Sequence, residues 1–152
     1  MKYGSLFQTA RIALLAVILG SMFTEVVPAE VTAKQREAYQ RSLFASFDQN
    51  HNGKLTQSEF VQVIIGNLFR DFDKDKSGKI SHKEFLGYAI DKMQAEKEYP
   101  IMDAEAKGFI TLKDVYRNKA LIQRIGQEFG NLDTKGKGYV TLADLPDLTP
   151  ED

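Results

Sequence analysis

Apolar residues recur along most of the chain at the spacing of one α-helix face. The first segment with this spacing carries Tyr39, Leu43, Phe44 and Phe47. Three more follow, over 60–72, from residue 85 onward and over 115–129. Because a stripe of this kind marks the buried face of a helix, we interpret its phenylalanines as core residues. The pattern predicts an all-α fold.

Proline and glycine modify this prediction at two points. The ring of Pro100 disfavours helical backbone in the preceding residue, so the third helix should end before Tyr99. Gly66 leaves two alternatives for the second segment, a continuous helix or one that breaks at Gly66-Asn67. We favour the continuous helix, because one glycine inside a helix costs only about 1 kcal/mol.

The first 29 residues follow another pattern. Lys2 and Arg11 precede a charge-free apolar run over 12–23. Small residues that end at Ala29 then mark a cleavage point before Glu30. This order is that of a secretory signal peptide, which predicts a periplasmic or secreted protein without membrane contact after cleavage. The alternative is a membrane anchor through residues 12–23, although a membrane-spanning helix needs about 20 apolar residues. The predicted division is a signal peptide over 1–29, one domain over 30–145 and a flexible tail over 146–152.

Four copies of one short pattern are centred on glycine. The glycines are 25, 30 and 30 residues apart: Gly53, Gly78, Gly108 and Gly138. Each has an aspartate five residues before it, an apolar residue two after it, a hydroxyl residue three after it and an acid six after it. The apolar residues are Leu55, Ile80, Ile110 and Val140. Four matching features in four copies indicate an internal repeat.

The first two copies resemble the calcium loops of the EF-hand family. Residues 48–59 match the EF-hand pattern D-x-[DN]-x-[DN]-G-x5-E in full, and residues 73–84 depart from it only at Ser77. The resemblance implies helix-loop-helix repeats with short β contacts between loops, and two bound Ca2+ ions. The compact spacing of the loops resembles that of EF-hand proteins exported by bacteria.

The residue types in both loops suit a hard cation that takes six to eight oxygen ligands. The expected metal ligands of the first loop are Asp48, Asn50, Asn52, Lys54, Thr56 and Glu59. Those of the second loop are Asp73, Asp75, Ser77, Lys79, Ser81 and Glu84. The two lysines offer only backbone carbonyls, the ninth-position hydroxyls hold the place of a bridging water, and the glutamates bind with both oxygens. Thr56 with Glu59, and Ser81 with Glu84, also match the S/T-x-x-E capping box that begins a helix. Few acids and several nearby lysines predict weak sites, on the order of micromolar to sub-millimolar affinity.

The other two copies carry lysine where an ion would lie. Lys107 occupies the fifth position of 103–114, and Lys135 and Lys137 occupy the third and fifth positions of 133–144. An ammonium group has donors but no acceptor, and the final aspartates are one methylene shorter than glutamate. We therefore expect both loops to be empty of calcium and to act as scaffold.

The spacing of the first two loops limits how they pair. Only 13 residues separate Glu59 from Asp73, and a helix of that length is about 20 Å long. Such a helix would place the first two loops at opposite ends. Either it breaks and these two loops pair, or the first loop pairs with the third and the second with the fourth.

Composition excludes several other classes of protein. The 152 residues have net charge −1 and 43% hydrophobic content, which fits one globular domain and gives no basic footprint for nucleic acid. The absence of cysteine excludes disulfides, thiolate catalysis and cysteine zinc sites. The two histidines, His51 and His82, sit at outward loop positions, and no catalytic motif is present, so we expect no enzyme. The sequence predicts a calcium sensor or buffer outside the cytoplasm, or alternatively a protein-interaction module with structural calcium, and it identifies no protein partner.

Overall fold

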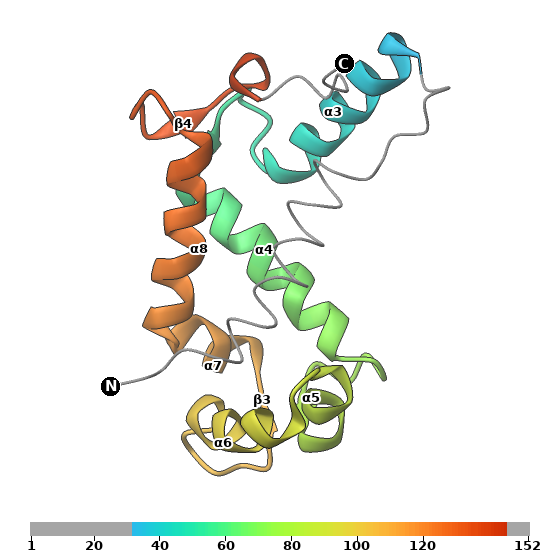
Figure 1. The fold of residues 1–152 in the computed structure, drawn as a ribbon, viewed down its shortest axis with the longest axis vertical. Helices are drawn as coiled ribbons and strands as arrows, with labels where there is room; N and C mark the ends of the chain where they lie inside the picture. The colour runs from blue at the N-terminus through green and yellow to red at the C-terminus, as the bar shows by residue number, and fades with distance from the viewer. Residues whose placement is uncertain (1–31, 146–152) are drawn as a thin grey trace.

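A computed structural model of the chain describes residues 32–145 and shows a mostly helical fold (Figure 1). The predicted all-α class is confirmed. The predicted signal peptide (1–29) and tail (146–152) lie outside the described residues. In chain order the elements are α3 (Ala33–Phe47), β1 (Leu55–Thr56), α4 (Gln57–Phe72), β2 (Ile80–Ser81), α5 (His82–Tyr88), α6 (Lys92–Met102), β3 (Phe109–Ile110), α7 (Leu112–Arg117), α8 (Lys119–Leu132), β4 (Tyr139–Val140) and the 3-10 helix η2 (Leu142–Asp144). Among these described helices, none is long and apolar enough to cross a membrane.

Helix α4 is continuous over 16 residues. The Thr56 hydroxyl accepts a hydrogen bond from Glu59 N at 3.3 Å, and Thr56 N donates to Glu59 Oε2 at 3.0 Å, so this pair caps the start of the helix. The helix passes Gly66 without a break and ends at Phe72. At 1.5 Å per residue it is about 24 Å long. The prediction of a continuous helix is confirmed.

The third predicted helix is divided into α5 and α6. Asp91 Oδ1 accepts a hydrogen bond from Gln94 N at 3.0 Å and so caps the start of α6. The prediction that this segment ends before Tyr99 is wrong, because α6 continues through Pro100 to Met102. Pro100 lies in the last turn, where its ring removes one backbone hydrogen bond and leaves the final one, from Asp103 N to Tyr99 O at 2.8 Å, in place.

Asn118 divides the last predicted helix into α7 and α8. Its Oδ1 accepts a hydrogen bond from Leu121 N at 3.1 Å, and its backbone N–H donates to Val115 O at 3.1 Å. Asparagine competes with helical hydrogen bonds in this way, so this residue ends α7 and caps α8. The prediction of one helix over 115–129 is therefore wrong.

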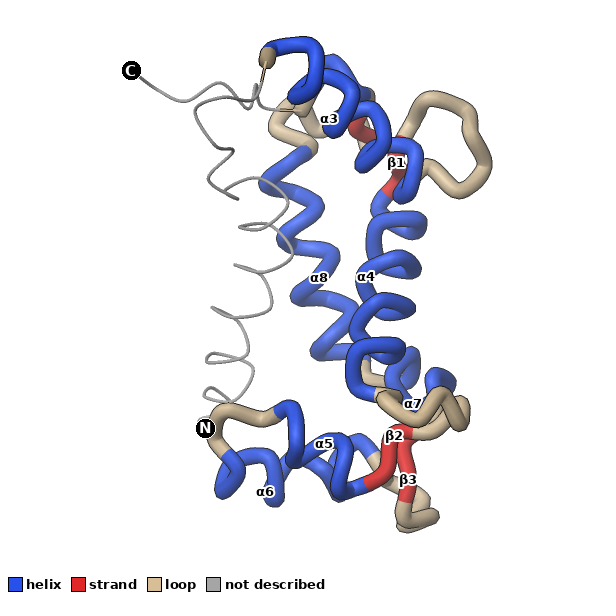
Figure 2. The backbone as a smooth tube through the Cα atoms, turned by 90° about the vertical axis from the view of Figure 1, so that its right-hand side faces the viewer, coloured by secondary structure: helices blue, strands red, loops and turns tan. Residues whose placement is uncertain are grey.

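The four loops, numbered 1 to 4 in chain order (48–59, 73–84, 103–114 and 133–144), pair in an unexpected order. β1 pairs with β4, with Leu55 opposite Val140, and β2 pairs with β3, with Ile80 opposite Ile110. The predicted short β contacts between loops are confirmed, but both predicted pairings are wrong: loop 1 pairs neither with loop 2 nor with loop 3, and loop 2 does not pair with loop 4. The reason is that α8 packs beside α4 in the opposite direction (Figure 2). The start of α4 therefore meets the end of α8, which brings loop 1 to loop 4 and loop 2 to loop 3.

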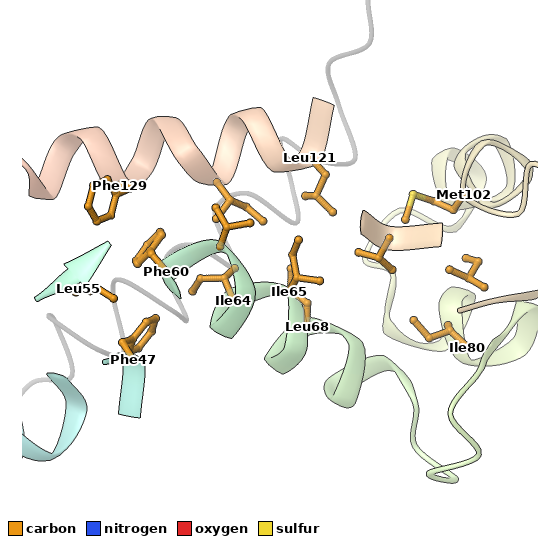
Figure 3. Packing of buried hydrophobic residues seen from close by; sticks show 14 of the residues in the cluster. Phe47, Leu55, Phe60, Ile64, Ile65, Leu68, Ile80, Met102, Leu121 and Phe129 are labelled. Atoms are coloured by element: carbon orange, nitrogen blue, oxygen red, sulfur yellow. The ribbon is translucent and has the colours of Figure 1, made fainter. Parts of the chain in front are cut away.

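The hydrophobic core follows α4 between the two pairs of loops (Figure 3). Three of its side chains are fully buried: Ile65, Ile110 and Val140. Phe60 of α4 stacks on Phe47, with ring centroids 5.7 Å apart, and contacts Phe129 of α8 at 5.8 Å. The interpretation of the phenylalanines as core residues is confirmed for these three, whereas Tyr39 of the same predicted stripe is exposed. Because Ile110 and Val140 belong to the strands, the core connects both loop pairs.

Candidate metal centres

All four loops have the same backbone conformation. The sixth residue of each loop is a glycine with φ between 75° and 80°, and the fourth residue also has a positive φ. The fourth residues are His51, Lys76, Ala106 and Gly136. Glycine adopts this left-handed conformation without a steric penalty, whereas most residues avoid it. The repeat in the sequence therefore corresponds to one repeated loop shape.

The first aspartate of each loop organises that shape. In loop 1, the two oxygens of Asp48 accept hydrogen bonds from Asn52 N at 3.1 Å and from Gly53 N at 2.8 Å. The equivalent bonds to the first aspartates of the other loops are 2.6–2.9 Å long. Because these donors are backbone groups of the same loop, all four loops share one internal framework.

Loop 1 brings its predicted ligands Asn50 and Glu59 together. Asn50 Nδ2 donates to Glu59 Oε1 at 2.7 Å, and the Thr56 hydroxyl donates to Glu59 Oε2 at 2.7 Å. Asp48 and Glu59 are buried, with 4% and 7% of their surface exposed. A buried carboxylate loses its water and needs a compensating charge or hydrogen bonds. A cation among these oxygens would supply that charge, once the Asn50 amide turns its oxygen inward.

The remaining predicted ligands of loop 1 lie in the same turn. Asn52 Oδ1 accepts a hydrogen bond from Lys54 N at 2.7 Å, and Asn50 Oδ1 accepts one from Asn52 N at 3.1 Å. The carbonyl-bearing residue Lys54 is exposed and directly precedes β1. Loop 1 thus gathers two carboxylates and two amides in one turn, which is an oxygen-rich site of low charge.

Loop 2 gathers three carboxylates. Oxygens of Asp73, Asp75 and Glu84 lie within 4.8 Å of one another. Hydrogen bonds from the side chain and backbone of Ser81 lower the pKa of Glu84, and hydrogen bonding to Ser77 lowers the pKa of Asp75. Both groups are therefore ionised at neutral pH. Oxygens with this charge and spacing suit Ca2+.

The hydroxyl and carbonyl ligands predicted in loop 2 also lie together. The Ser77 hydroxyl donates to the backbone oxygen of Lys79 at 3.2 Å. The Ser81 hydroxyl donates to Glu84 Oε2 at 2.6 Å and caps α5, as the sequence predicts. Loop 2 therefore carries one more carboxylate than loop 1 in the same framework.

In loop 3 a lysine of the loop itself forms ion pairs with the loop's carboxylates. Lys107 Nζ lies 2.7 Å from Asp114 Oδ2 and 3.4 Å from Glu105 Oε2. Arg117 adds contacts of 2.5 Å to Glu105 and 3.5 Å to Asp114. Burial raises the pKa of the Asp114 carboxyl, but hydrogen bonds from Lys107 and Thr111 outweigh this effect and lower the pKa to about 2. The twelfth carboxylate of this loop is therefore neutralised by cations of the chain itself.

Loop 4 repeats this arrangement with two lysines. Lys135 Nζ lies 2.9 Å from one oxygen of Asp144, and Lys137 Nζ lies 2.5 Å from the other. Hydrogen bonds from Lys137, Thr141 and Lys135 hold the pKa of Asp144 far below its ordinary value. We call loops 3 and 4 the lysine loops, because in each an ammonium group contacts the twelfth carboxylate.

Family models match the other two loops. A model described as EF hand matches residues 41–64, and one described as EF hand domain matches residues 64–90. Two segments of the chain thus match EF-hand models, and we call loops 1 and 2, which lie in these segments, the EF-hand loops. Each matched segment holds one carboxylate-rich loop with parts of its flanking helices, and α4 contributes to both, which supports calcium binding. A comparison with curated proteins gives no significant match.

Two aromatic residues beside the EF-hand loops were missed in the sequence analysis. Lys54 Nζ of loop 1 lies 4.6 Å from the ring centroid of Tyr139, and Lys79 Nζ of loop 2 lies 4.3 Å from that of Phe109. Tyr139 and Phe109 occupy the seventh positions of the lysine loops, where the EF-hand loops have lysine. This alternation was visible in the sequence, but only the pairing of the loops shows that the residues meet.

Neither histidine belongs to a metal centre among the described residues. His51 is exposed at the fourth position of loop 1. His82 is also exposed but begins α5, where its Nε2 lies 2.8 Å from Glu96 Oε2 and its ring contacts Tyr99 edge-on. The expectation of outward positions therefore holds for both, although His82 belongs to a helix and has partners.

The low pKa of Asp114 predicts an acid-sensitive contribution to stability. Because the folded pKa (about 2) lies below the ordinary value of 3.8, this group stabilises the fold fully above about pH 4, and the stabilisation is lost as pH falls through 2. Carbon chemical shifts of the carboxyl, followed against pH in calcium-free protein, should show this titration. In Lys107→Met the pKa should rise toward 3.8. A wild-type Asp114 that titrates near 4 would contradict the assigned ion pair.

Proposed function

We propose that the protein is a calcium-binding protein that acts outside the cytoplasm as a sensor or buffer, with one ion in loop 1 and one in loop 2. One observation carries the proposal. The four loops share a backbone framework, but the twelfth carboxylates of loops 3 and 4 have lysine partners, whereas Glu59 and Glu84 form no ion pair with any described residue. The EF-hand loops are therefore the two in which an external cation would complete the charge balance.

The ligand sets support two sites of unequal charge. Loop 1 offers the carboxylates Asp48 and Glu59 beside amide oxygens, and loop 2 offers Asp73, Asp75 and Glu84. Calcium affinity rises with the number of charged ligands, which favours loop 2. Lys74, Lys76, Lys79 and Lys83 surround loop 2 and oppose that advantage. Weak sites of this kind suit a compartment with high free calcium.

A protein-interaction module with structural calcium is a second candidate. The observation in its favour is a group of exposed apolar side chains in and before α6: Ile90, Met93 and Ile101, which are 70%, 71% and 61% exposed. Exposed apolar side chains that form one patch often belong to binding surfaces, and these three come from one short stretch of the chain, 90–101. Circular dichroism separates the candidates, since a module with purely structural calcium loses its helical signal when calcium is removed, whereas a buffer retains it.

We predict two calcium ions per chain. Isothermal titration calorimetry of residues 30–152 with CaCl2 should give a stoichiometry of two, because among the described residues only loops 1 and 2 combine the oxygen ligands with a twelfth glutamate that forms no ion pair. A stoichiometry of zero would contradict the calcium-binding proposal. A stoichiometry of four would show that the lysine loops bind calcium as well.

Substitution of the twelfth residues should separate specific ligands from general acidity. Glu59→Gln and Glu84→Gln each keep the side-chain length but remove one charge and one strong ligand, so each should empty its own loop. The matched controls Asp114→Asn and Asp144→Asn remove the same charge from the same position of the lysine loops and should leave two ions bound. General attraction would make all four variants similar, with losses of at most about 1 kcal/mol each. Calorimetry on the four variants decides between these outcomes.

The location outside the cytoplasm rests on the sequence of residues 1–29. This segment has the order of a signal peptide and lies outside the described residues. We predict that mature protein isolated from its native host begins at Glu30. Amino-terminal sequencing checks this. Intact Met1 on membrane-bound material would instead favour the anchor through residues 12–23.

A further inference from the structure

The same group of contacts occurs at both ends of the molecule. At one end, a row of four residues in contact links loop 2 to loop 3: Lys79, Phe109, Lys107 and Asp114. At the other end, the equivalent row links loop 1 to loop 4: Lys54, Tyr139, Lys137 and Asp144. In each row two ammonium groups lie near one aromatic ring, at 4.3 Å and 5.7 Å from the Phe109 centroid and at 4.6 Å and 4.9 Å from the Tyr139 centroid.

Each row ends on a carboxylate of a lysine loop. Lys107 Nζ lies 2.7 Å from Asp114, and Lys137 Nζ lies 2.5 Å from Asp144. These carboxylates also accept hydrogen bonds from the ninth-position residues, Thr111 and Thr141, at 2.6–3.0 Å. Glu59 and Glu84 accept the corresponding bonds in the EF-hand loops. The ammonium group is thus the part that distinguishes the two kinds of loop.

The ammonium group supplies what a bound ion would supply. It places a positive charge against the twelfth carboxylate and joins it to the first half of the loop, because Lys107 and Lys137 are fifth-position residues. Their backbone N–H groups also donate to Asp103 and Asp133, at 2.9 Å in both loops. Each lysine therefore holds both ends of its loop together, and the depressed pKa of Asp114 agrees with a close cation.

The aromatic ring connects each lysine loop to the EF-hand loop with which it pairs. Lys54 and Lys79 are the seventh residues of loops 1 and 2, and their backbone carbonyls are the expected calcium ligands. Each side chain lies over a ring of the lysine loop, and the next residue, Leu55 or Ile80, is buried in the strand pair. The seventh residue is thus held on two sides by the neighbouring loop.

We propose that each lysine loop is kept in its folded shape by its own ammonium group and positions the EF-hand loop it pairs with through Phe109 or Tyr139. The first half of this proposal needs no calcium. The second half rests on the proposed function, because it concerns the affinity of loops 1 and 2 for calcium. Loop 3 acts on loop 2 and loop 4 acts on loop 1, and neither acts on the other end of the molecule.

Hydrogen exchange on the calcium-free wild-type protein tests the first half. The glycines Gly53, Gly78, Gly108 and Gly138 each donate to the first aspartate of their loop and report on one loop each. Without calcium, Gly108 and Gly138 should exchange at least about tenfold more slowly than Gly53 and Gly78. Calcium should then slow only Gly53 and Gly78. Equal exchange at all four glycines without calcium would overturn the ammonium-held loop.

A lysine variant supports the same test. In the presence of a calcium chelator, Lys107→Met should lower the melting temperature by about 5 °C or more, because the substitution leaves the buried Asp114 without its main cation. Lys107→Arg should retain most of the wild-type value. The control Lys113→Met removes the same charge from α7 at an exposed residue that forms no ion pair with the described residues, and it should leave the melting temperature unchanged. Equal effects of Lys107→Met and Lys113→Met would overturn the proposal.

Calcium titrations followed at the amides of Gly53 and Gly78 test the second half. Phe109→Leu should weaken binding at loop 2 by about two- to fivefold and leave loop 1 unchanged, as loss of a cation–π contact at an exposed site implies. Tyr139→Leu should do the reverse. Phe109→Tyr keeps the ring and should retain wild-type affinity. An equal effect at both loops, or none, would overturn the positioning role, whereas wild-type protein that binds no calcium would refute the proposed function and leave the exchange test valid.

Discussion

The antiparallel packing of α4 against α8 decides the arrangement of the whole molecule. Helix α4 is too long and too regular for the loops at its two ends to meet, so each loop needs another partner. Helix α8 lies alongside in the opposite direction and supplies one at each end (Figure 2). The core residues between these helices therefore set which loops pair.

This packing gives each EF-hand loop a lysine loop as its neighbour. A pair of calcium loops side by side would place two ions close together and would couple their binding directly. Here the proposed ions lie at opposite ends of α4, and the positive charge beside each one is an ammonium group that is always present. The result is two similar ends, each with one proposed calcium ion and one ammonium group of the chain.

The comparison of the loops separates backbone shape from ion chemistry. In all four loops the backbone N–H of the sixth residue donates to the first aspartate, and the hydroxyl of the ninth residue donates to the twelfth carboxylate. The fifth position decides the chemistry, since Asn52 and Ser77 offer oxygens whereas Lys107 and Lys137 offer positive charge. A loop of this repeat can therefore keep its backbone shape when a lysine of the chain itself supplies the positive charge.

The sequence by itself determined the local features of this protein. The positions of the four loops, the caps at Thr56 and Ser81, and the continuity of α4 depend on neighbouring residues, which is why spacing and residue type predicted them. The breaks at Ala89–Asp91 and Asn118 depend on a choice between a side-chain cap and a helical hydrogen bond, which periodicity does not resolve. The pairing of loop 1 with loop 4, and the contact of Lys54 with Tyr139, were decided only by the tertiary structure. These contacts join residues 85 positions apart in the chain, and only the direction of α8 relative to α4 brings them together.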